Sequence, residues 1–122
     1  MAGMYGNNVA KTVRNGIARV GPGAWTRLVA NAITSTNPSP LESRQWIRIQ
    51  HRGTGGLAIA YSQKNSDGTF TAPTYSAQGA IVLPAGAILG EPLSEQVMMW
   101  GRWTDKVNSG NGGTKVIVTE YA

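Results

Sequence analysis

The chain has 122 residues, a net charge of +5 and no cysteine. This length leaves room for one domain and no second, and it suffices to bury roughly two-thirds of the surface that the unfolded chain exposes. The absence of cysteine excludes disulfides and thiolate metal sites, and no apolar run is long enough for a secretory signal or a membrane span.

Charge is sparse and unevenly distributed. Charged residues make up 14% of the chain, well below the typical quarter. Such a composition favours a β-rich protein, or one whose surface is covered by other chains. Residues 1–52 carry seven bases and one acid, whereas residues 53–122 carry four bases and five acids. A basic half of this kind is attracted to nucleic acid, an anionic membrane or an acidic protein, and scattered single arginines favour the protein.

The N-terminal segment is predicted to be an extended arm. Apolar residues between Val9 and Val20 have helical spacing, but Asn15 and Gly16 interrupt the pattern and no convincing cap precedes it. A helix remains the alternative. We expect an N-terminal arm over residues 1–23 and a β-sandwich domain over residues 24–122.

The stretch RQWIRIQHRGTGGLAIAY, residues 44–61, predicts a β-hairpin around the GTGG turn. Ile47, Ile49 and His51 share one side of its first strand, and the return strand alternates in the same way from Leu57. An isolated hairpin does not recover the conformational entropy that it loses on folding, so this one must pack against a second layer.

Short apolar segments separated by turn signals continue to the end of the sequence. They are AWTRLVA at 24–30, a run ending in the Asp67-Gly68 turn, IVLPAGAIL with a Pro-Ala-Gly corner, VMMWGRW at 97–103 and TKVIVTEYA at 114–122. Seven or eight strands at this spacing are typical of a sandwich or barrel. We therefore predict an all-β fold: a single antiparallel β-sandwich, jelly-roll-like, with an extended N-terminal arm.

The segment at 97–103 is apolar on both faces. Val97, Met99 and Trp103 share one face, and Met98 and Trp100 share the other. A strand with one face in water should alternate apolar with polar residues. Its second face is therefore covered either by the chain's own arm or by another subunit.

Residues suited to catalysis are few. The single histidine, His51, alternates with Ile47 and Ile49, which favours a hydrogen-bonded residue at the edge of the core. No spacing of His51 and the carboxylates indicates a metal site, and neither GNGGTK nor GTGG has the order and context of a phosphate-binding loop. We predict no catalytic, cofactor-binding or metal-binding residues, and no enzyme activity.

Nucleic-acid binding is an alternative, because Trp46, Arg48 and Arg52 share a strand face on which bases could stack. In the predicted hairpin that face continues into small residues from Ala58, without a second aromatic residue. Carbohydrate binding through the other tryptophans is a third possibility, but the polar groups that would orient a sugar are not identifiable.

Residues 44–121 resemble small virion proteins of tailed bacteriophages. The resemblance rests on the R-x-W-x-x-I-Q-x-x-G strand, the Pro-Ala-Gly corner, the tryptophan-rich strand and the Gly/Ser loop before the last Val-Ile-Val strand. In those proteins such a strand opens a β-sandwich, often a decoration or cement protein at the capsid surface, or a component of the neck or tail.

The resemblance implies a structural role without cofactors. A basic N-terminal half attached to a near-neutral β-domain suits docking on an acidic protein shell, which favours a decoration protein, made in the host cytoplasm, that stabilises the phage head by clamping the major capsid protein. A dimer or trimer with no membrane association is expected. The alternatives are a neck or tail protein and, more weakly, a nucleic-acid-binding module. The predicted interface residues are Lys11, Arg14, Arg19, Arg27, Trp46, Arg48, Met98 and Trp100.

Overall fold

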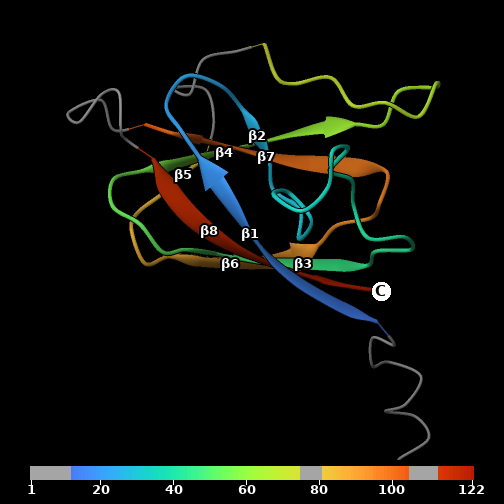
Figure 1. The fold of residues 1–122 in the computed structure, drawn as a ribbon, viewed down its shortest axis with the longest axis horizontal. Helices are drawn as coiled ribbons and strands as arrows, with labels where there is room; N and C mark the ends of the chain where they lie inside the picture. The colour runs from blue at the N-terminus through green and yellow to red at the C-terminus, as the bar shows by residue number, and fades with distance from the viewer. Residues whose placement is uncertain (1–11, 75–80, 105–112) are drawn as a thin grey trace, which may run out of the picture.

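The computed structural model describes residues 12–74, 81–104 and 113–122. These residues form eight antiparallel strands and no helix, so no helix among them could cross a membrane. The strands are β1 (Val13–Val20), β2 (Thr26–Arg27), β3 (Trp46–His51), β4 (Leu57–Gln63), β5 (Ile81–Leu83), β6 (Ile88–Pro92), β7 (Val97–Trp103) and β8 (Thr114–Tyr121). They build two four-stranded sheets stacked as layers (Figure 1). The predicted β-sandwich is confirmed.

The strands pair in the nested order of a jelly roll. β1 pairs with β8, β2 with β7, β3 with β6 and β4 with β5, as in one long hairpin that has been rolled up. Two further pairings, β3 with β8 and β4 with β7, complete the sheets. Sheet A has the order β1-β8-β3-β6, and sheet B has the order β2-β7-β4-β5. Eight strands in two such sheets are the jelly-roll arrangement.

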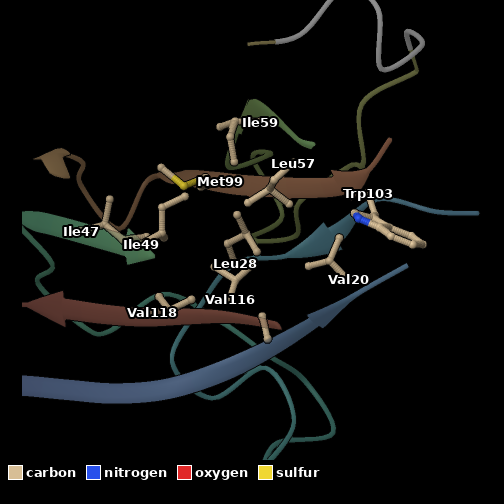
Figure 2. Packing of buried hydrophobic residues seen from close by; sticks show 11 residues of the cluster. Val20, Leu28, Ile47, Ile49, Leu57, Ile59, Met99, Trp103, Val116 and Val118 are labelled. Carbon is tan, nitrogen blue, oxygen red and sulfur yellow. The ribbon is translucent and has the colours of Figure 1, made fainter. Parts of the chain in front are cut away.

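The core lies between the sheets and is filled by alternate residues of facing strands. Ile47 and Ile49 of sheet A pack against Leu57, Ile59 and Met99 of sheet B, and all five are buried (Figure 2). Successive side chains of a strand point to opposite faces, so one face of each strand supplies the core.

Residues 44–61 do not form the predicted hairpin. β3 lies in sheet A and β4 in sheet B, so the two strands are not paired with each other. The residues between them form a corner that crosses from one layer to the other. A Cβ on Gly53 would lie 1.9 Å from Thr114 Oγ1, so this close approach requires glycine. The apolar faces of the two strands do meet, but across the core.

Two other predicted turns are confirmed. In the turn after β4, Gly68 has a φ of 88° and its amide donates to the Asn65 carbonyl at 2.9 Å. In the Pro-Ala-Gly corner, Gly86 has a φ of 84°, and the chain passes from β5 in sheet B to β6 in sheet A. Positive φ is available to glycine at little cost, so both glycines suit their turns.

The predicted arm is corrected over residues 13–20, which form edge strand β1 of sheet A, paired with β8 along its whole length. The backbones of Thr12 and Ala122 extend this pairing with hydrogen bonds of 3.1 and 2.9 Å. Neither the helix nor a separate arm applies to this segment, and the sandwich already includes it well before residue 24. Residues 1–11 lie outside the described residues.

A buried carboxylate joins β8 to β1 and to the segment between β2 and β3. Glu120 is fully buried, on the inward face of sheet A. Its carboxylate accepts hydrogen bonds from the backbone amides of Ala30 and Leu41 at 2.8 and 3.0 Å. It also forms ion pairs of 2.7 Å with Arg14 and with Arg44. The segment between β2 and β3 is thereby held against the sandwich.

Arg44 carries this network to the segment between β6 and β7. Its side chain is fully buried, and it donates to the carbonyl oxygens of Leu93 and Ser94 at 3.1 Å and to that of Val97. Burial lowers the pKa of Arg44, while Glu120 opposes that change. Burial alone would raise the pKa of Glu120, but hydrogen bonds from Ala30 and Arg14 outweigh it and lower that pKa.

Glu120→Gln is expected to lower the free energy of unfolding by about 3–5 kcal/mol, because it leaves the buried Arg44 guanidinium without its counter-charge. Urea unfolding followed by tryptophan fluorescence measures this change. Glu42→Gln, at an exposed position, is the control and should change stability by less than about 0.5 kcal/mol. Equal effects of the two variants would contradict the role given to Glu120.

Stability is also expected to fall in acid. Because the folded-state pKa of Glu120 lies below its usual 4.5, its contribution is complete above pH 4.5 and is lost as the pH falls through the folded value. Urea midpoints between pH 7 and pH 2 measure this loss. Glu120→Gln should lack this part of the pH dependence, and an unchanged profile in that variant would rule the explanation out.

Candidate protein interface

The outer face of sheet B is covered by the chain itself. Met98 and Trp100 of β7 pack there with Val29, and Trp25 and Phe70 cover the cluster. Trp25 and Val29 flank β2, and Phe70 lies in the segment after β4. A second small core therefore lies outside the main one.

This packing corrects the prediction that Met98 and Trp100 contact another chain. Their exposed fractions are 0% and 5%, and the Trp100 indole N–H donates to Ser62 Oγ at 2.8 Å. Arg27 is also held in place, because its guanidinium lies 5.5 Å from the centre of the Trp100 ring and donates to the Pro38 carbonyl at 2.7 Å. The cover expected for this strand was the N-terminal arm or another subunit, whereas residues flanking β2 and Phe70 after β4 provide it.

The outer face of sheet A has no such cover among the described residues. The strand register places its outward side chains in rows that run across the four strands. The first row, Val13, Tyr121, Trp46 and Pro92, is apolar and aromatic. Val13 and Trp46 are 52% and 42% exposed. A row of this kind suits contact with another protein.

Two further rows follow along the strands. The second contains Asn15, Thr119, Arg48 and Gly90, and the third contains Ile17, Ile117, Gln50 and Ile88. Ile88, on the edge strand β6, is 53% exposed. With the first row, they make a surface of apolar and neutral polar side chains with one arginine, which we call the sheet A face.

The sheet A face contains no carboxylate among the described residues. Glu120 points inward from β8, and Glu91 points inward from β6, where it accepts a hydrogen bond from the Tyr61 hydroxyl. Burial and this hydrogen bond raise the pKa of Tyr61. Beyond the third row, Arg19 lies opposite Lys115, both exposed. The whole side of the sandwich is therefore cationic.

Trp46 lies across the sheet A face rather than standing away from it. A Cβ on Gly90 would be 3.4 Å from Trp46 Nε1 and 3.8 Å from Cζ2, so the indole rests over the glycine of the neighbouring strand. Trp46 is also the cross-strand partner of Tyr121. Trp46, lying over Gly90, and Tyr121 beside it therefore form an aromatic patch on the sheet A face.

The remaining predicted interface residues fall into three groups. Trp46, Arg48 and Arg19 lie on the outward side of sheet A. Arg14 points inward, is used by Glu120 and also donates to the Ser39 carbonyl at 2.8 Å. Lys11 lies outside the described residues.

Sequence reasoning missed Val13, Tyr121, Ile88 and Lys115 as members of this side. The alternation of TKVIVTEY does place Lys115, Ile117, Thr119 and Tyr121 on one face. That β1 and β3 lie on either side of this strand, with their outward residues in line with these, depends on long-range strand pairing, which a local sequence pattern does not indicate.

His51 is a buried residue with both ring nitrogens occupied. Nε2 lies 2.8 Å from the Gly55 carbonyl, which only accepts, and the Thr114 hydroxyl lies 3.0 Å from Nδ1. His51 is therefore a buried, hydrogen-bonded residue beside the core, as its alternation with Ile47 and Ile49 predicts. Among the described residues, no three His, Asp or Glu side chains are grouped so that they could hold a metal ion.

The structure also changes the case for nucleic-acid binding. The strand face with Trp46 does not continue into Ala58, as the predicted hairpin required, because β4 is in the other sheet. It continues into Tyr121, which supplies a second aromatic residue. The neighbouring Val13, Ile17 and Ile88 are aliphatic, however, and favour protein over bases.

The scan of protein-family models and the search of curated proteins each found no match. Among solved structures, the chain is similar to the coat protein of the Tobacco streak virus coat protein dimer, with a TM-score of 0.38 and 6% sequence identity. The alignment covers 88% of this chain and 86% of that one.

The two tryptophans are expected to respond differently to truncation. Trp100→Ala should lower the free energy of unfolding by about 3–5 kcal/mol, because it empties a buried site. Trp46→Ala should cost about 1 kcal/mol or less, since it removes an exposed cross-strand contact. Urea unfolding of both variants measures the difference. A larger loss for Trp46 than for Trp100 would contradict the assignment of covered and uncovered faces.

Proposed function

We propose that this chain is a structural virion protein of a tailed phage, a capsid decoration protein that binds the major capsid shell through the sheet A face. The observation that carries the proposal is the contrast between the two outer faces. Over β7, sheet B is covered by the chain's own residues, whereas sheet A presents apolar, neutral polar and cationic side chains without a carboxylate among the described residues. Such a surface is complementary to an acidic protein surface.

The fold and the sequence support this proposal in different ways. Jelly rolls occur in viral capsid domains, but also in lectins and cupins, so the fold alone does not select a function. The resemblance of residues 44–121 to small phage virion proteins supports a role at the surface of the capsid. A neck or tail position uses the same surface and is the alternative.

The size of the sheet A face fits an interaction that is weak in each copy. Two steps of two residues separate the three rows and three inter-strand spacings separate the four strands, which gives about 14 Å by 14 Å, or roughly 200 Å². A standard interface buries about 800 Å² per partner. A capsid repeats its surface many times, so an oligomeric decoration protein gains affinity by binding at several points.

An apolar edge supports self-association into a dimer or trimer. Ile81 and Val82 of β5 are 58% and 50% exposed, and Ile88 of β6 lies on the same side of the sandwich, beyond the corner that joins the two strands. Both are edge strands, whose free backbone groups can pair with another copy. Sedimentation equilibrium tests this expectation directly.

The purified protein is expected to co-sediment with emptied capsids of its phage, and Arg48→Glu should weaken this binding at least ten-fold by reversing the only charge in the three rows. Lys64→Glu makes the same charge change on the sheet B side and should bind as wild type does. Failure of the wild-type protein to bind capsids would refute the proposal. Retention of DNA on filters with a steep salt dependence, in place of capsid binding, would favour the nucleic-acid module.

A further inference from the structure

A groove opens beside the fourth pair of outward residues on sheet A. Its walls come from the end of β1, the start of β8 and the corner between β3 and β4, and its volume is about 510 Å³. It adjoins the sheet A face, because Arg19 and Lys115 line it and are the next outward pair after Ile17 and Ile117.

Two glycines allow the segments that line the groove to approach each other closely. A Cβ on Gly53 would lie 1.9 Å from Thr114 Oγ1, and one on Gly113 would lie 2.9 Å from the Val20 carbonyl oxygen. Both contacts are closer than real side chains tolerate. The groove is therefore lined largely by backbone and small hydroxyl residues, with the two long cations beside them.

The cations of the groove repel one another. Arg19 and Lys115 are direct cross-strand partners, and like charges at such positions are unfavourable. A third cation, Arg52, lies near this pair, because its backbone amide donates a hydrogen bond to the Lys115 carbonyl at 2.9 Å. Both ion pairs found among the described residues go to Glu120, on the other face of the sheet. An external anion would relieve this repulsion.

We propose that the groove binds an acidic peptide segment of the shell partner, with carboxylates between Arg19 and Lys115. This inference rests on the proposed function and names the chemistry of the partner. The groove is far larger than one oxyanion needs, and it is continuous with the apolar rows of the sheet A face. Alternate side chains of an extended segment lie about 6.8 Å apart, a spacing that flexible Arg and Lys side chains can match.

The test uses a fluorescein-labelled, end-blocked hexaglutamate peptide and the full chain, followed by fluorescence anisotropy in low salt. Wild type should bind, and binding should weaken as salt rises. Arg19→Glu and Lys115→Glu should each weaken binding at least ten-fold. Lys64→Glu is the control of equal charge on the sheet B side and should bind as wild type does. Lys115→Ser should lose affinity while its thermal midpoint stays the same or rises, because a like-charge contact is removed.

Three outcomes would overturn the inference. If Lys64→Glu weakened peptide binding as much as the groove variants do, the net charge of the protein would explain the binding and the groove would not. Displacement of the peptide by millimolar inorganic phosphate, or tighter binding of oligothymidylate at the same residues, would make the groove a phosphate site. Capsid binding that Lys115→Glu leaves unchanged would keep the proposed function and remove the groove from it. Conversely, groove-dependent peptide binding by a protein that ignores capsids would refute the proposed function and leave the site standing.

Discussion

The interaction on which the structure depends most is the carboxylate of Glu120 with its four donors. Two are backbone amides of the segment after β2, and two are arginines, one on β1 and one just before β3. A buried carboxylate without partners would be strongly unfavourable, whereas one with this set of donors is held ionised. The ion pairs specify the positions of two loops, the one between β2 and β3 and, through Arg44, the one between β6 and β7, and the aliphatic core supplies the bulk of the stability.

The placement of these loops decides which surface is free. The segment held by Glu120 leads back to β2, whose flanking residues cover Met98 and Trp100 on sheet B. No described segment crosses the outward rows of sheet A. The two outer faces therefore differ in cover: residues flanking β2 and Phe70 pack over Met98 and Trp100 on sheet B, and the proposed binding surface is the outward face of sheet A.

Much of the fold was predictable from the sequence, because it is written in local patterns. The alternation of β3, β4 and β8, the glycine turns and the two-sided apolar strand β7 all correspond to observed features. The hairpin of residues 44–61 was wrong because a GTGG stretch signals a reversal of direction and does not say whether the next strand pairs or crosses to the other sheet. β1 was missed because its inward positions include Arg14 and Gly16. The arginine is needed for Glu120, and the glycine makes room for Ala30, since a Cβ there would lie 1.6 Å from the Ala30 carbonyl oxygen.

The pairing of β1 with β8 has a consequence for how the protein is made. Val13 lies opposite Tyr121, so the first strand leaves the ribosome more than a hundred residues ahead of its partner. Sheet A is then incomplete throughout translation, and β1 lacks the strand with which it pairs until β8 emerges. Closure of the sandwich is expected to be a late and slow step dominated by long-range contacts, during which the nascent chain is at its most prone to associate with its neighbours.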